Sequence, residues 1–147
     1  MHVIRLRAGT PDVLVVLADG NDVGPQARRE EIESMGLDRV FPVYVVGTPD
    51  PSVEAWLLAD PQSLAAEFGH RLPGATPRGS KALKRFLVEY LEDAGKVVME
   101  GGTEFADEIV AAMDMYRAGK AEPTLKRFLD ELKVAIETAT VQSGGGT

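Results

Sequence analysis

The chain has 147 residues, of which 44% are hydrophobic and 27% are charged, and its formal net charge is −7. This length fits one domain, and the acidic balance excludes a general electrostatic grip on nucleic acid, although a local basic patch or a bound metal can offset it. There is no cysteine and there are two histidines, which excludes disulfides, zinc–thiolate sites and thiol nucleophiles. No apolar run approaches the roughly 18 residues of a membrane span, and the charged N-terminus is not a signal peptide. We therefore expect a soluble cytoplasmic protein.

The first part of the chain has the pattern of a parallel α/β unit. HVIRLR at residues 2–7 alternates apolar and basic residues and predicts a short edge strand. VLVVLA at 13–18 is continuously apolar, which is typical of a strand buried on both faces. PQARREEIESMGL at 25–37 predicts a surface helix, and RVFPVYVVG at 39–47 a second buried strand, with Pro42 at an edge or at its beginning. We expect an α/β fold with a mostly parallel sheet flanked by helices.

The second part of the chain is predicted to be helical. Residues 51–69 indicate a helix start, a break at Pro61 and a further helical segment, followed by a loop to residue 80. Three more helices are expected at residues 81–95, 104–119 and 123–139. Asp107 and Asp114 would then share one face of the middle helix, with solvent exposure as the simpler reading. The predicted domain spans residues 1–139, and residues 140–147 are expected to form a disordered tail.

Acidic and amide side chains follow the first buried strand. Asp19, Asn21 and Asp22 lie in one turn, and Gly20 allows the backbone to bend sharply there. Ligands of parallel α/β sheets gather beyond the carboxyl ends of the strands, and Mg²⁺ or Mn²⁺ prefers oxygen ligands. The pattern therefore indicates a hard-cation site. The alternative is a polar turn whose side chains cap the next helix.

The segment after the second buried strand reaches the same sheet edge. Glu54 and Asp60 there are further candidate ligands for the cation. For Glu54 the alternative is a favourable position near a helix N-terminus. Asp60 can instead end one helical turn and cap the next. Trp56, the only tryptophan, is more typical of a core or interface residue than of a stacking platform for a ligand.

One dense basic patch stands out in this acidic chain, made up of Arg78, Lys81, Lys84 and Arg85. If nucleic acid binds, its phosphates are expected at this patch. The alternative is a solvated helix face. Lys126 and Arg127 form a weaker second candidate.

Three segments together resemble an uncharacterised Toprim-like family of small prokaryotic proteins. They are VLVVLADGND, PSVEAWLLADPQSLAAEFG and AMDMYRAGKAEPTLKRFLDEL, and the match covers roughly residues 13–135. The resemblance implies a Toprim-type α/β domain and Mg²⁺-dependent phosphodiester chemistry. Asp19 matches the first acid of an acid-x-acid pair, Asn21 stands at the second position, and Asp22 can substitute for it. Glu54 and Asp60 match the acidic positions around the tryptophan helix, and Asp19 and Glu54 would serve catalysis.

The chain departs from this family pattern, because no Glu-Gly strand precedes Asp19 and Asn21 replaces a carboxylate. Two functions follow as expectations. The first is a Mg²⁺-dependent nucleic-acid hydrolase, which the family resemblance links to defence against phage or foreign DNA. The second is a catalytically inactive binding module that acts with an AAA-type ATPase. A phosphate-receiver domain is disfavoured, since no lysine follows the later strand.

Overall fold

The computed structural model describes residues 2–6 and 13–144, and within them it places three strands in the order β1-β2-β3. The strands are β1 (His2–Leu6), β2 (Val13–Leu17) and β3 (Val43–Gly47). β1 pairs antiparallel with β2, and β2 pairs parallel with β3. The α/β class, the edge strand and the parallel pair of buried strands are confirmed. The predicted residue 7 of the edge strand lies outside the described residues.

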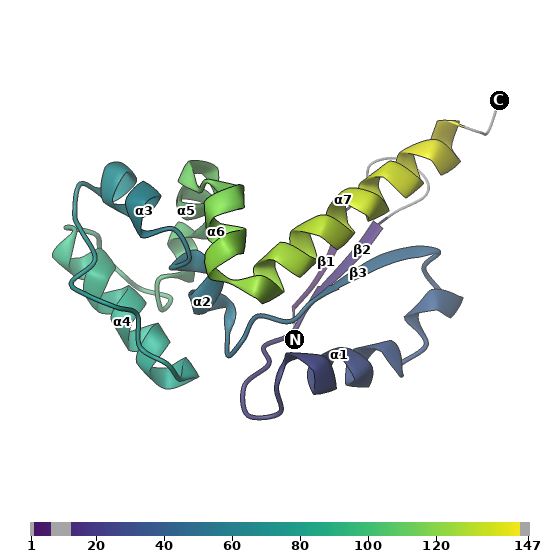
Figure 1. The fold of residues 1–147 in the computed structure, drawn as a ribbon, viewed down its shortest axis with the longest axis horizontal. Coiled ribbons are helices and arrows are strands. Elements are labelled where there is room, and N and C mark those ends of the chain that lie inside the picture. Colours follow the sequence, from purple (N-terminus) through teal and green to yellow (C-terminus); the bar gives the residue numbers. More distant parts are fainter. Residues whose placement is uncertain (1, 7–12, 145–147) are drawn as a thin grey trace.

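Two helices cover the opposite faces of this sheet, α1 (Pro25–Glu33) on one side and α7 (Pro123–Gly144) on the other (Figure 1). Successive side chains of a strand point to opposite faces. Val45 therefore packs with Ala135 of α7, whereas Val46 packs with Ile32 of α1. Burial on both faces explains why the central strands are continuously apolar.

The ends of several predicted elements are corrected by the structure. The residues between α1 and β3 form a short 3₁₀ turn, η1 (Leu37–Arg39), so the second buried strand begins at Val43 and not at residue 39. Pro42, which lacks an N–H, directly precedes the strand, and the strand itself is at the sheet edge. Helix α7 continues to Gly144, so residues 140–144 extend the helix and do not begin a tail.

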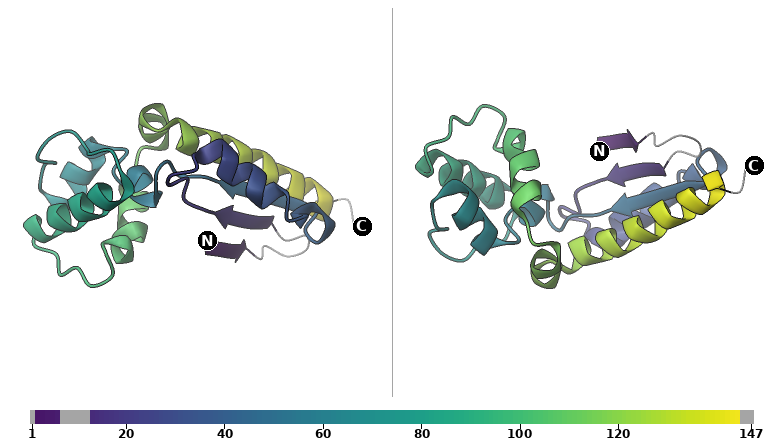
Figure 2. Two further views of the ribbon diagram at one scale, coloured as in Figure 1. Left: turned by 90° about the horizontal axis from the view of Figure 1, so that it is seen from below. Right: turned by 90° about the horizontal axis from the view of Figure 1, so that it is seen from above.

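The remaining helices gather beyond the carboxyl ends of β2 and β3, which gives the molecule an elongated shape (Figure 2). We call the sheet with α1 and α7 the first layer of the molecule, and this group of helices its second, helical layer. They pack around a core that contains Leu64, Leu87, Leu91 and Ile109. The break predicted at Pro61 is confirmed, because α3 begins there. The elements of this layer are α2 (Val53–Leu57), α3 (Pro61–Phe68), α4 (Ser80–Asp93), η2 (Thr103–Phe105), α5 (Ala106–Ala112) and α6 (Met115–Ala121).

The prediction of a single helix over residues 104–119 is wrong. The backbone is extended at Met113, and Asp114 caps a new helix by accepting a hydrogen bond from the Arg117 N–H at 2.9 Å. Asp107 consequently lies in α5, whereas Asp114 is the N-cap of α6, and the two share no helix face. A local preference of Asp for the N-cap position wins over the apolar spacing that suggested one helix.

Trp56 joins the two layers. Its ring stacks on Phe128 of α7 with centroids 5.2 Å apart, and its Nε1 donates a hydrogen bond to Thr124 Oγ1 at 2.9 Å. It is buried together with Ala118 and Leu125, which confirms a core role. Within the described part of the chain, no helix is long and apolar enough to cross a membrane.

Candidate functional site

The loops that follow the two parallel strands are bonded to each other along the backbone. Gly20 N–H donates to the Pro49 carbonyl at 2.7 Å, and Asn21 N–H donates to the Pro51 carbonyl at 2.8 Å. Asn21 has a φ of 45°, a left-handed conformation that asparagine tolerates better than most residues. The two loops therefore form one edge, as expected for the carboxyl ends of parallel strands.

The Asp19 carboxylate lies at the start of α2. Its Oδ1 accepts a hydrogen bond from the backbone N–H of Val53, the first residue of that helix, at 3.1 Å. The Asp19 carbonyl accepts one from Arg28 Nε at 3.0 Å, which ties the turn to α1. Asp19 thus does cap a helix, but it is α2 and not the helix that follows it in the sequence. α1 has Gly24 at its N-cap and no side-chain cap.

The side chains of Glu54 and Ser52, which flank Val53 in the sequence, are buried, and each has an oxygen without a hydrogen-bond partner. Glu54 is 4% exposed and Ser52 is fully buried, yet neither Glu54 Oε2 nor Ser52 Oγ has a partner. No other buried side-chain oxygen or nitrogen in the described residues is left unbonded in this way. A buried carboxylate without a donor or a counter-ion is strongly unfavourable. Glu54 Oε2 is therefore an oxygen that a donor from outside the described chain, such as a cation or a water molecule, would satisfy.

Asp60 has a different partner from the one that was predicted. The Asp60 side chain is 1% exposed and forms a bidentate ion pair with Arg117. The Arg117 Nε lies 2.7 Å from Oδ1, and its Nη2 lies 3.1 Å from Oδ2. The backbone N–H groups of Ser63 and Asp114 donate to the same carboxylate. Burial raises the pKa of Asp60, but these hydrogen bonds outweigh it and hold the pKa well below its usual range. Asp60 is a structural anchor between α3 and α6.

The predicted set of cation ligands does not form one cluster. Asn21 and Asp22 are exposed on the turn. Among the residues that the structure describes, no three His, Cys, Asp or Glu side chains are grouped so as to hold a metal ion. Asp19 and Glu54 remain, linked through the N-terminal residue of α2.

Two further acids share this end of the molecule and were not predicted as site residues. Asp50 lies in the loop after β3, and Glu122 lies between α6 and α7. Burial raises the pKa of Glu122, and the negative charge of Asp50 raises it further. Asp50 was recognisable as a residue at a strand end, whereas nothing in the sequence placed Glu122 near it.

The predicted basic patch lies on another element. Lys81, Lys84 and Arg85 are exposed on α4, and Arg78 is exposed in the loop before it. Lys81 and Arg85 line a hollow of about 740 Å³. The Arg85 side chain is 3.5 Å from Glu89, so part of its charge is neutralised.

No family model, curated protein or solved structure matches the chain. The Toprim-like resemblance therefore rests on the sequence motifs alone.

Proposed function

We propose that the chain binds a divalent cation, Mg²⁺ or Mn²⁺, at Asp19 and Glu54 and hydrolyses a phosphodiester of nucleic acid. The observation that carries the proposal is Glu54, a buried carboxylate with an oxygen that no group of the described chain satisfies. Its place beyond the carboxyl ends of two parallel strands is where α/β proteins bind ligands. The Toprim-like motifs supply the reaction class.

The donor set suits a hard cation. Mg²⁺ commonly takes one or two carboxylates and completes its octahedron with water and substrate oxygens. Asp19 uses Oδ1 to cap α2, and none of the described residues donates a hydrogen bond to its Oδ2. The unpartnered hydroxyl of Ser52 adds a neutral oxygen close by in the chain. Asp19 and Glu54 would hold the cation, with the exposed Asn21 and Asp22 able to approach from the turn.

The residues of the chain have defined parts in such a site. The Val53 N–H fixes one oxygen of Asp19, and Arg28 fixes the backbone of the turn. A bound cation would polarise the phosphate and neutralise developing charge. Arg78, Lys81, Lys84 and Arg85 would neutralise phosphates farther along a nucleic-acid strand.

An inactive binding module that acts with an ATPase partner is the second candidate. It is favoured by the absence, among the described residues, of a third carboxylate grouped with Asp19 and Glu54. Classical metal-dependent phosphoester chemistry uses a denser cluster of acids. In this alternative the cation site is retained and hydrolysis is lost.

The test begins with calorimetric titration of Mn²⁺ and Mg²⁺ into the wild type, Asp19→Asn, Glu54→Gln and the control Asp38→Asn. Asp38 is an exposed acid in η1, away from the site. Its replacement by Asn removes one negative charge, as the other two substitutions do. We expect saturable binding in the wild type and the control and a large loss in the other two variants. Equal binding in all four proteins, or none in the wild type, contradicts the cation site.

A thermal-unfolding series checks the same site independently. A ligand present at 100 times its dissociation constant stabilises the folded state by about 2.7 kcal/mol. For a chain of this size that corresponds to a rise in Tm of roughly 5–11 °C. Glu54→Gln should abolish this rise. Nicking of supercoiled plasmid DNA in the presence of Mg²⁺ or Mn²⁺ then separates the candidates. A wild type that binds the cation but does not nick the plasmid supports the inactive module.

A further inference from the structure

A separate pocket of about 200 Å³ opens between the first turns of α1 and α7. Its walls include the apolar side chains of Val46 and Phe128. The polar residues that line it are Gln26, Arg29, Thr48, Thr124 and Arg127. The charged side chains lining this pocket are therefore both arginines, in a protein with a net charge of −7.

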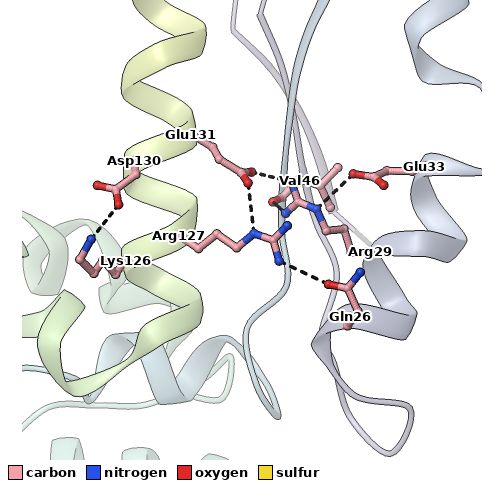
Figure 3. Close-up of polar contacts among 8 residues, drawn as sticks. All are labelled: Gln26, Arg29, Glu33, Val46, Lys126, Arg127, Asp130 and Glu131. Carbon is pink, nitrogen blue, oxygen red and sulfur yellow. Dashed lines mark hydrogen bonds and ion pairs between the residues drawn. The ribbon is translucent and has the colours of Figure 1, made fainter.

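Both arginines are ion-paired with glutamates that lie outside the pocket. Glu131 accepts from Arg29 Nη2 at 2.6 Å and from Arg127 Nε at 3.1 Å, as Figure 3 shows. Arg29 also donates to Glu33 at 3.1 Å and to the Val46 carbonyl at 3.3 Å. Glu33 and Glu131 line the neighbouring groove along β3 and not this pocket. The two guanidinium groups are thus oriented by acids that line the groove, so the charged side chains on the pocket wall itself are the two arginines.

Donors remain available on Arg127. Its Nη1 makes one long bond of 3.4 Å to Gln26 Oε1, and its Nη2 donates to no group in the described chain. The side chain is 53% exposed, so it can adjust to a ligand. Guanidinium groups form charge-assisted hydrogen bonds with phosphate oxygens and often use two N–H groups at once.

Thr48 adds a hydroxyl donor to the wall of the pocket. It follows β3 directly, is 7% exposed and lines the pocket. Its hydroxyl forms no hydrogen bond with any described residue, and its oxygen, unlike Glu54 Oε2 and Ser52 Oγ, is not fully enclosed, so water or a ligand can reach it. An acceptor oxygen placed in the pocket would complete it.

Both helices present their N-terminal ends to the same pocket. α1 begins at Pro25 and α7 at Pro123, and both prolines line the cavity. A helix N-terminus carries a partial positive charge and free N–H groups. α1 has no side-chain cap, so its first-turn N–H groups are not occupied by its own cap residue.

We propose that this pocket binds a phosphate group. Two arginines, an unbonded threonine hydroxyl and two helix N-termini converge on a cavity whose size matches a small oxyanion. A water molecule takes up about 30 Å³, so 200 Å³ holds one phosphate and a few waters but no nucleoside beside it. The phosphate is either a free ion or the terminal group of a larger ligand. This binding does not depend on the proposed cation site.

The test is an NMR titration of the ¹⁵N-labelled full chain with inorganic phosphate at constant ionic strength and without divalent cations. We expect saturable shifts of backbone amides at the beginnings of α1 and α7 and at Thr48. Arg127→Gln and Thr48→Val should each weaken binding about tenfold, as expected for losing one hydrogen bond to a charged group. Arg39→Gln, an exposed arginine of η1, is the matched control and should bind like the wild type.

Other variants and ligands decide between the outcomes. Asp19→Asn should retain phosphate binding, even if it loses the cation, which separates this proposal from the proposed function. A dinucleotide with a 5′-phosphate is compared with its 5′-hydroxyl form. Tighter binding of the phosphorylated form identifies a terminal phosphate, and binding of inorganic phosphate alone identifies the free ion. Weak, non-saturating shifts spread over all basic residues, or equal affinity of Arg127→Gln and Arg39→Gln, would overturn the proposal.

Discussion

The ion pair between Asp60 and Arg117 is expected to be one of the strongest single contributions to the stability of the helical layer. The perturbation is Asp60→Asn, which keeps the size of the side chain but replaces one acceptor oxygen by an amide donor. The Asp60 carboxylate accepts from Ser63 and Asp114 N–H groups and twice from Arg117. In either orientation of the new amide, one backbone N–H and one guanidinium N–H face another donor.

The expected cost follows from these contacts. A buried N–H without an acceptor costs about 1–3 kcal/mol, and a lost bond to a charged group about 1.5–3 kcal/mol. Removing one partner of a buried ion pair typically costs about 3–5 kcal/mol. Because Arg117 is 42% exposed and can be rehydrated, we expect a value near the lower end, about 3 kcal/mol. That is a large part of the total stability of about 5–15 kcal/mol for a domain.

Urea unfolding at pH 7, followed by the fluorescence of Trp56, measures this change. Trp56 is the only tryptophan and lies between the two layers, so its signal reports on both. Asp93→Asn, an exposed acid at the end of α4, is the matched control. A free energy of unfolding for Asp60→Asn within about 0.5 kcal/mol of the wild type would refute the reasoning.

The same pair predicts how stability depends on pH. The pKa of Asp60 is lower in the folded state than in the unfolded chain, where it is near 3.9. Its contribution is therefore complete above about pH 5 and is lost as the pH falls below the unfolded value. The difference in stability between wild type and Asp60→Asn should narrow steadily below pH 4. A difference that stays constant down to pH 2.5 would show that the carboxylate charge is not involved.

Two further substitutions test the packing of the sheet and of the helical layer. Gly47→Ala would place a methyl 2.5 Å from Leu17 Cδ2, and overpacking of this kind costs about 1–3 kcal/mol in urea unfolding, so a neutral result would show that the core at this strand end is loosely packed. Tyr90→Phe removes a buried hydroxyl whose single hydrogen is shared between the Leu64 carbonyl at 3.1 Å and the His70 carbonyl at 2.6 Å. It should cost about 1–3 kcal/mol and speed limited proteolysis in the loop after α3, whereas unchanged cleavage would mean that other contacts hold the loop.

Local patterns were sufficient to predict most of the secondary structure. The unbroken apolar run before Asp19 is typical of a strand covered on both sides, and α1 and α7 supply the cover. Proline and glycine marked several boundaries, as at Pro61 and Pro123. The prediction of one helix failed over residues 104–119. The apolar spacing continues through Asp114, but the Asp114 carboxylate accepts a capping hydrogen bond from the Arg117 backbone N–H, and a new helix begins there.

The site was only partly predictable, because its partners come from distant parts of the chain. Asp19 and Glu54 were chosen as residues after neighbouring strand ends, and parallel pairing does place them at one edge. Asp60 follows the same strand end in the sequence and was predicted as a ligand for the same reason, but the Arg117 guanidinium of α6 is bonded to its carboxylate. No local pattern indicates which acid will meet Arg117.

The sequence by itself determined the class of the fold, since the periodicity of apolar residues records which faces of each element are buried. It also determined which side chains leave the ends of the parallel strands. The tertiary structure alone decided which polar groups are satisfied, because each partner is brought in by packing of an element far away in the chain. Asp60 is paired with Arg117, no described residue donates to Glu54 Oε2, and Arg29 and Arg127 both donate to Glu131. Those outcomes depend on helix positions that no short stretch of sequence encodes.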